Sequence, residues 1–298
     1  MPEKNLLAEK FEEKRAHLRS VAYRMLGTPS EAEDAVQEAW LRLSRSDADS
    51  IDNLGGWLTT VVARVCLDML RSRQSRREEP FTPDAPEPVA TGTHGSSPEH
   101  EALLADSVGL ALLVVLDKLT PAERLAFVLH DMFAMPFDEI APMLEKSPAA
   151  TRQLASRARR RVKGGAPAAD ADLARRRHVV DAYLAATRGG DFEALIALLH
   201  PDVVFRADKA AVPTPEPIVI RGAHPVAKGA MASMNRAWFT GPALVDGAVG
   251  LVMAPRGRLR LVLTFTIVEG TITEIEVIAE PDRLGRLDLA VPDAVVSG

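Results

Sequence analysis

The sequence predicts a multi-domain protein in which two all-α domains precede an α+β domain. Three observations favour this class. Apolar residues recur at helical spacing in residues 5–77 and 107–163, a proline-rich acidic segment separates these stretches, and strand-like patterns first occur after residue 200. A length of 298 residues corresponds, as a soft prior, to about two domains, so several small cores are expected in place of one large core.

The overall charge excludes one class of protein. Lys and Arg number 36 and Asp and Glu number 41, which gives a net charge of -5 and a pI of about 5.9, so the chain is no uniformly basic nucleic-acid coat. A local basic patch is still allowed. Apolar residues (47%) and charged residues (26%) are close to the averages of globular proteins, which argues against wholesale disorder.

The sequence carries few targeting or redox features. Cys66 is the only cysteine, which excludes an intramolecular disulfide and a CxxC zinc site, and its apolar neighbours predict a buried small hydrophobe. No metal site and no cofactor are expected. The N-terminal residues lack the pattern of a signal peptide, and no apolar run approaches roughly 18 residues. We therefore expect a cytoplasmic protein without a membrane segment.

Residues 1–77 are expected to form the first helical domain. Thr28 can cap a helix in which Pro29 takes the first position and Glu31 returns a bond to the cap. The apolar stripe of that helix consists of Ala32, Ala35, Val36, Ala39, Trp40 and Leu43. A second stripe consists of Leu58, Val61, Val62, Val65 and Met69, and it runs into arginines at positions 71, 73, 76 and 77.

Residues 78–106 differ from both flanking stretches and predict a linker. Five prolines and the run Thr91–Ser97 cannot continue a helix or pack a core. The segment holds seven acidic residues and no Lys or Arg. An extended, anionic tether is therefore expected.

Residues 107–165 are expected to form the second helical domain. The motif Thr120–Glu123 has the same capping pattern as the first domain. A short helix at Phe137–Ala141, a tight connection at Glu145–Ser147 and a longer helix after it give the helix-turn-helix pattern. Pro142 is expected to kink or shorten the short helix, because proline removes one backbone hydrogen bond.

The longer helix carries the strongest local signal. Residues 148–163 hold six positive charges and no acid, whereas a solvated helix surface normally mixes signs. Arginine pairs with phosphates and guanine edges, so this pattern favours a DNA-binding helix over a merely charged surface. In this geometry the first turns enter the major groove and the last turns lie along the backbone. Base contacts are assigned to Arg152, Gln153, Ser156 and Arg157, and phosphate contacts to Arg159, Arg160 and Arg161.

Residues 170–298 change pattern and predict an α+β domain. Helices are expected at about 172–187, 191–199 and 223–236, and strands at 202–206, 243–253, 258–268 and 271–279. Glu269-Gly270 is a hairpin turn signal between the last two strands. In the last strand Ile275 and Val277 alternate with glutamates, so one face of the sheet is expected to be wet.

Several motifs resemble bacterial extracytoplasmic-function sigma factors. Three segments resemble region 2 of that family: Tyr23–Gly27, Glu31–Leu43 and Gly56–Arg71. Three others are similar to region 4: Leu119–Arg124, Asp138–Ala141 and Thr151–Arg161. These regions together cover more than half of the chain, in the family's order. A weaker set is similar to the SnoaL-like, NTF2-type cone domain fused behind region 4 in the sigma-J-like group: Val180–Ala186, Gly190–Leu195, His200–Val204 and Arg221-Gly222.

This resemblance implies partners and site residues. The implied partners are core RNA polymerase, at its beta-prime clamp and beta flap, and promoter DNA, with residues 107–165 on the minus-35 element. The implied core-binding residues are Asp34, Gln37 and Glu38, and the implied minus-10 residues are Asn53, Trp57, Arg64, Asp68 and Arg71. For Trp57 two roles stay open, a stacking surface for an extruded base and a core residue.

The resemblance also implies an intramolecular contact between the linker and the C-terminal domain. Phe81 lies in an aromatic-proline motif of the linker, while Asp208 and Asp282 stand in the positions of a glycine-rich acidic motif and an Asn-Pro-Asp-Lys-Leu-like motif. Of the glycine-rich motif only the aspartate is kept. We expect the C-terminal domain to modulate sigma activity through this contact.

Two other functions remain open. Cone domains include cyclases and isomerases that use an acid/base carboxylate or histidine in an apolar pocket. The available residues are Asp181, His200, Asp208, His224, Trp238 and Asp246. Their spacing fixes no dyad, so a non-catalytic domain is expected. The other alternative is a helix-turn-helix repressor or activator that binds a repeated half-site without polymerase.

Overall fold

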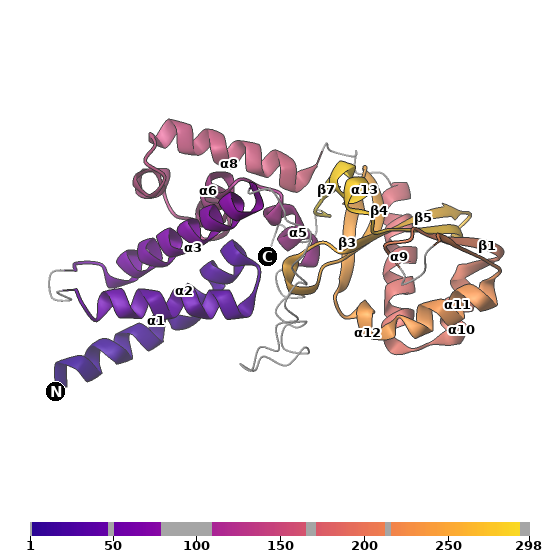
Figure 1. Cartoon of the computed structure of the whole chain (residues 1–298), viewed down its shortest axis with the longest axis horizontal. Helices are drawn as coiled ribbons and strands as arrows, with labels where there is room; N and C mark the ends of the chain where they lie inside the picture. The colour runs from indigo at the N-terminus through magenta and orange to yellow at the C-terminus, as the bar shows by residue number, and fades with distance from the viewer. Residues whose placement is uncertain (1, 47–50, 79–108, 165–170, 212–215, 293–298) are drawn as a thin grey trace. The chain divides into compact units, whose positions relative to one another are not determined.

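The computed structural model describes residues 2–46, 51–78, 109–164, 171–211 and 216–292 (Figure 1). The chain divides into two compact units, Met1–Glu101 with Lys118–Arg159, and Ala102–Asp117 with Arg160–Gly298. Each unit combines two separate segments of the sequence. The helix α5 (Leu110–Asp117) and the end of α8 (Pro148–Lys163) belong to the second unit.

Three long helices begin the first unit: α1 (Pro2–Leu26), α2 (Pro29–Leu43) and α3 (Leu54–Glu78). The predicted apolar stripes face its core, and only Trp40 and Met69 are partly exposed among them. Thr28 caps α2 by accepting the N–H of Glu31. The Thr28 hydroxyl donates to the carboxylate of Glu31, so the predicted bond between Glu31 and the cap is present. The same carboxylate also pairs with Arg73.

The helix-turn-helix follows in five short segments. These are α6 (Pro121–Phe127), the π-helix η2 (Val128–Met132), α7 (Phe137–Ile140), the 3-10 helix η3 (Ala141–Met143) and α8. The capping box of Thr120 and Glu123 is present with both reciprocal bonds. Pro142 shortens the helix as predicted, because α7 stops at Ile140 and a 3-10 turn replaces its continuation.

The helix-turn-helix packs against the three long helices within the first unit. Arg124 of α6 is only 2% exposed and donates two hydrogen bonds, of 3.1 and 3.2 Å, to the main-chain oxygen of Arg24 in α1. The rings of His17 and Phe133 contact each other edge to face, with 5.3 Å between their centroids. The guanidinium of Arg24 lies over the ring of Phe133. Buried polar and aromatic contacts therefore join the two segments.

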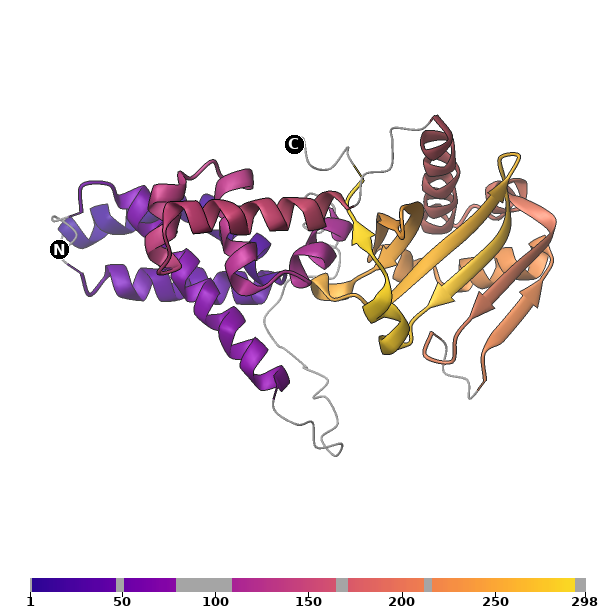
Figure 2. The same cartoon turned by 90° about the horizontal axis from the view of Figure 1, so that it is seen from above.

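The second unit is built on a sheet, shown in Figure 2, whose described strands have the order β2-β1-β6-β5-β4-β3-β7. The strands are β1 (Leu199–Ala207), β2 (Ile218–Arg221), β3 (Thr240–Val245), β4 (Ala248–Met253), β5 (Leu261–Val268), β6 (Thr271–Ile278) and β7 (Leu289–Ala290). Strands β1 and β6 are parallel, and the other neighbours are antiparallel. The α+β class is therefore confirmed.

Helices cover one face of this sheet and part of the other. The helices α9 (Ala171–Gly189), α10 (Phe192–Leu198), α11 (Ala223–Ala232) and α12 (Met234–Ala237) share the main apolar core with one face. The helix α5 packs on β3, β4 and β7, and all of Leu110–Leu116 are buried. A Cβ built on Gly241 would lie 3.3 Å from the Cβ of Leu110. Side chains alternate along a strand, so α5 lies on the face opposite to that of Thr240.

The structure corrects the prediction for 243–253. This stretch is part of a hairpin of two strands, β3 and β4, joined at Asp246-Gly247. Both turn residues have positive φ, 49° and 81°, as a tight primed turn requires. The predicted hairpin at Glu269-Gly270 is confirmed, whereas β2, β7 and the helix α13 (Pro281–Arg286) were not predicted.

In the described part of the chain, no helix is long and apolar enough to span a membrane.

Candidate nucleic-acid interface

The helix α8 presents a basic face. Its inner stripe is buried as predicted at Thr151, Ala155, Ala158 and Val162, while Leu154 is partly exposed. The predicted base-contact residues are all exposed, namely Arg152, Gln153, Ser156 and Arg157. The predicted phosphate-contact residues Arg160 and Arg161 are exposed as well.

A stack of three side chains orients Arg152. The rings of His130 and Phe137 are stacked, with 3.8 Å between their centroids, and Arg152 lies over Phe137 at 5.3 Å. The Nδ1 atom of His130 lies 3.0 Å from the main-chain oxygen of Met135, and this contact holds the imidazole ring in place beneath Phe137. This order reduces the side-chain entropy that Arg152 would lose on binding a base.

Arg159 differs from its neighbours. Its side chain is 39% exposed and forms an ion pair of 2.5 Å with Asp131, in the π-helix before the turn. The carboxylate that holds this guanidinium lies within the helix-turn-helix itself. The ion pair gives Arg159 a structural contact within the helix-turn-helix, and the phosphate role predicted for it stays a prediction.

The predicted minus-10 residues lie along α3 and at its start. Arg64, Asp68 and Arg71 are exposed and follow one another at helical spacing, so they share one face. Asn53 accepts the N–H of Gly56 at 3.0 Å and thus caps the helix. Trp57 is half-buried, which leaves both of its predicted roles open.

Arg73, which belongs to the arginine run at the end of α3, contacts other helices of the first unit. Its guanidinium pairs with Glu31 and donates to the main-chain oxygen of Leu26 at 3.3 Å. The arginine run after α3's apolar stripe therefore includes at least one residue that holds the helices together. Sequence alone offers no means to separate Arg73 from Arg71, because both follow the same apolar stripe.

The predicted core-binding residues lie on the outer face of α2. Asp34 and Gln37 are exposed, and Glu38 is half-exposed and pairs with Arg42 at 3.0 Å. Leu41, one turn further, is 38% exposed and was missed. A leucine inside the polar face of an amphipathic helix was the signal for it. A groove lies beside this face. It is lined by Gln37 and Trp40 of α2 and by six neighbours from α1 and α2, namely Ala8, Phe11, Glu12, Arg15, Glu33 and Val36.

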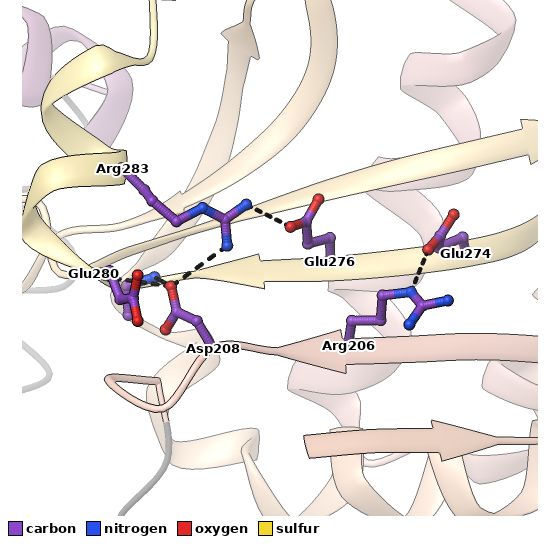
Figure 3. Close-up of polar contacts among 7 residues, drawn as sticks. Arg206, Asp208, Glu274, Glu276, Glu280 and Arg283 are labelled. Carbon is purple, nitrogen blue, oxygen red and sulfur yellow. Dashed lines mark hydrogen bonds and ion pairs between the residues drawn. The ribbon is translucent and has the colours of Figure 1, made fainter. Parts of the chain in front are cut away.

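Of the predicted regulatory residues, Asp208 and Asp282 differ in burial. Asp208 is buried at the end of β1, with Arg283 of α13 3.7 Å away and Glu276 of β6 on the other side of that guanidinium at 2.5 Å (Figure 3). Asp282 is exposed on α13. Phe81 and the rest of the predicted linker beyond Glu78 lie outside the described residues, so the contact between linker and domain stays a prediction.

The wet face of the sheet is confirmed by the same view. Ile275 and Val277 are buried, while the alternating glutamates of β6 form ion pairs. Glu274 pairs with Arg206 of β1 at 2.8 Å, beside the pair of Glu276 and Arg283 (Figure 3). Cross-strand pairs of opposite charge stabilise a solvated sheet face.

The residues considered for catalysis are not brought together. Asp181 pairs with Arg177 at 3.5 Å, and the carboxylate of Asp246 accepts the N–H of Asp288 at 2.8 Å. The ring of His200 accepts the N–H of Asp202, His224 contacts the ring of Phe192, and Trp238 is exposed beneath Arg188. Each has a local contact, and no dyad forms among these described residues.

Cys66 is buried, and its thiol is not reactive. Burial raises the pKa of the Cys66 thiol to about 12, so the thiol stays protonated, and the prediction of a buried hydrophobe is confirmed. No cluster of three or more His, Cys, Asp or Glu side chains suited to a metal ion occurs among the residues the structure describes.

Comparisons with known proteins agree with this arrangement. The family model for sigma-70 region 2 matches residues 11–76, and the model for sigma-70 region 4 matches residues 109–162. The ECF RNA polymerase sigma factor SigJ of Mycobacterium tuberculosis (strain ATCC 25618 / H37Rv) is 40% identical over 296 residues, which covers 92% of this chain and 91% of SigJ.

One further relative and one solved structure come from the same species. The probable ECF RNA polymerase sigma factor SigI (strain CDC 1551 / Oshkosh) is 36% identical and covers 92% of this chain and 93% of its own. The crystal structure of the extracytoplasmic function sigma factor SigJ aligns at 35% identity with a TM-score of 0.44, over 93% of this chain and 98% of that one. By its sequence similarity over nearly its whole length, the chain belongs to the extracytoplasmic-function family of RNA polymerase sigma factors.

Proposed function

We propose that this protein, a sigma factor that directs transcription initiation, binds core RNA polymerase in the cytoplasm through the exposed face of α2. Asp34 and Gln37 supply polar contacts on that face, and Glu38 lies beside them. Leu41 supplies an apolar anchor of the kind that interfaces bury at their centre. The proposed partner of this face is the beta-prime clamp, and the region 4 segment is proposed to meet the beta flap.

Promoter DNA is proposed to meet two helices. The face of α3 with Arg64, Asp68 and Arg71 would take the minus-10 element, with Asn53 and Trp57 at the start of the helix. The helix α8 would take the minus-35 element. The observation that carries this proposal is its exposed arginine face without acids, since each phosphate contact releases counterions and thereby favours binding.

The first unit would have to open for both elements to be read. Elements about 25 base pairs apart are about 85 Å apart on B-form DNA, at 3.4 Å per base pair. A compact unit of roughly 140 residues has a radius of gyration of about 14 Å. Because Arg124 joins α6 to α1 in that unit, we propose that polymerase binding supplies the free energy that separates them.

Run-off transcription tests the proposal. Core RNA polymerase is given templates with randomised minus-35 and minus-10 elements, with and without the protein, and the transcripts are sequenced. Defined start sites that require both proteins are expected. Leu41→Glu should weaken binding to core polymerase, whereas Val268→Glu, at an exposed apolar residue of β5, should leave it unchanged. Tight, site-specific binding of a dimer without polymerase would instead favour a repressor or activator.

The C-terminal domain is proposed to regulate and not to catalyse. The packing of α5 supports this proposal. The helix lies within the segment that matches sigma region 4, and it packs on β3, β4 and β7 of the C-terminal domain. A change in the sheet would thus reach region 4 directly. The contact of the linker with Asp208 or Asp282 remains a second proposed route.

A substitution at the seat of α5 tests this regulation. Gly241→Leu should displace Leu110, since a Cβ there already lies 3.3 Å from the Leu110 Cβ, and should change promoter output in run-off transcription. Gly285→Leu is the control, because a Cβ at Gly285 meets nothing within 4 Å. Equal output from both variants would contradict the role of α5.

A further inference from the structure

The second unit contains a cavity, partly open to solvent, that the functions above do not use. It has a volume of about 210 Å³ and lies between the sheet and the helices α9, α11 and α12. Its walls are mainly aliphatic and aromatic, with Leu251 and Leu263 on the sheet side and Val226 and Ala230 on the helix side. The side chains of a packed core normally leave few voids larger than a water molecule, so a void of this size is unusual.

The hydroxyl groups of the cavity come from α9, from the residue between α11 and α12, and from the start of β3. Thr187 and Ser233 donate their hydroxyl protons to main-chain oxygens, at 2.8 and 3.2 Å, and Thr240 does the same at 3.0 Å. The protons of these three hydroxyl groups are therefore already used in hydrogen bonds, and toward a ligand the hydroxyl oxygens can act only as acceptors. Tyr183 is 5% exposed, and burial raises its pKa to about 12, so its phenol stays protonated at neutral pH.

Arg236 is the one charged side chain among the described residues that line this cavity. It is exposed, and no carboxylate pairs with it in the described part of the chain. The lining residues that the structure describes also include no carboxylate, imidazole or thiol. The cavity therefore has a cationic group for recognition and lacks a group that could act as a general base at neutral pH.

We propose that this cavity is a binding site for a compact apolar carboxylate, with its ring or branched chain between the sheet and α11 and its carboxylate on Arg236. Size supports the assignment. A dry cavity of about 150 Å³ holds benzene, and sites for drug-sized ligands begin at about 300 Å³. At about 210 Å³ the cavity suits one ring system with a short substituent. Guanidinium groups favour carboxylates through charge-assisted hydrogen bonds.

The probe for this site is 2-naphthoate, added to the full-length protein and followed by its own fluorescence. The neutral isostere 2-naphthamide is the matched ligand. Saturable binding of naphthoate is expected, with naphthamide weaker by about tenfold, because the amide lacks the charge that pairs with Arg236. Arg236→Met should remove this preference, while Arg258→Met, at an exposed arginine outside the cavity lining, should keep it.

A cavity-filling pair locates the site. Ala230→Leu should abolish binding of both ligands, whereas Ala232→Leu, on the exposed side of the same helix, should not affect it. If Ala230→Leu lowers the thermal midpoint of the protein, Leu263→Trp fills the cavity from the sheet side in its place. The proposal is overturned by no saturable binding, by binding that survives filling, or by an Arg236→Met variant that still prefers naphthoate.

Discussion

The carboxylate of Asp208, at the end of β1, accepts the main-chain N–H of Glu280 at 2.9 Å across 72 residues of chain. The same carboxylate accepts the N–H groups of Ala279 at 2.8 Å and Ala211 at 3.1 Å, and it is 7% exposed. Asp208 therefore fixes the start of α13 against β1. Its acceptor capacity is largely used inside the domain.

Removal of that carboxylate is expected to destabilise the second unit. Asp208→Ala should lower its free energy of unfolding by about 2–3 kcal/mol, because buried N–H groups lose a charged acceptor. Asp282→Ala, at an exposed position of the same motif, should stay within about 0.5 kcal/mol of the parent. Urea unfolding and hydrogen exchange at residues 279–286 measure both variants. Equal changes in the two would mean that Asp208 does not anchor α13.

Arg124→Met is expected to loosen the first unit. The guanidinium is buried and donates to the Arg24 carbonyl, so its loss should cost about 2–4 kcal/mol. Arg45→Met, at an exposed arginine after α2, is the control and should change stability by less than about 0.5 kcal/mol. Scanning calorimetry compares the two. A normal unfolding midpoint for Arg124→Met would remove this contact as a support of the first unit.

Two arginines of α8 are expected to act differently on DNA. If Arg157 reads a base, Arg157→Ala should cost about 1–3 kcal/mol and relax sequence preference. Arg160→Ala should weaken all sequences alike and reduce the salt slope by about 1, as a phosphate contact does. Binding of the polymerase holoenzyme to matched and mismatched minus-35 duplexes, over a range of KCl concentrations, measures both. Equal, sequence-independent losses would refute the division of roles.

Arg159 is expected to act on stability. Because its ion pair with Asp131 is partly exposed and screened, Arg159→Ala should cost about 0.5–1 kcal/mol. A double-mutant cycle with Asp131→Ala isolates the pair by thermal unfolding. Arg160→Ala should leave the unfolding midpoint unchanged. A coupling free energy of zero between Arg159 and Asp131 would return Arg159 to the set of phosphate contacts.

The stability of the first unit is expected to fall at acidic pH through His17. Partial burial lowers the pKa of His17 below the ordinary 6.5, although the residue is exposed on one side, and the charge of Lys14 lowers it further. The unfolded chain then takes up a proton near pH 6.5 that the folded chain does not yet bind, so stability is full above that pH and falls below it.

The replacement His17→Phe tests this dependence while it keeps an aromatic ring against Phe133. Between about pH 7.5 and about pH 5.5 the variant should lose less stability than the parent. Thermal midpoints across that interval measure the difference. Identical losses in both proteins would assign the pH dependence to other groups.

The sequence by itself determined the elements whose causes are local. The caps at Thr28 and Thr120, the break at Pro142 and the turn at Glu269-Gly270 each depend on a few adjacent residues, and each forms as predicted in outline. The basic face of α8 could also be predicted from the sequence, because helical periodicity alone places its arginines opposite a buried stripe. The hairpin at Asp246-Gly247 was missed although its turn signal was present in the sequence.

Only the tertiary structure decided which charged residues are free and where α5 belongs. Arg124 and Arg159 carry the same charge as Arg157, but their partners lie on other segments, which no local pattern indicates. The helix α5 is apolar on all sides, so its periodicity could not show that it packs on the sheet. Asp208 likewise acquires its role from N–H groups some 70 residues away. Local propensity fixes secondary structure, whereas pairing and burial depend on residues that only folding brings together.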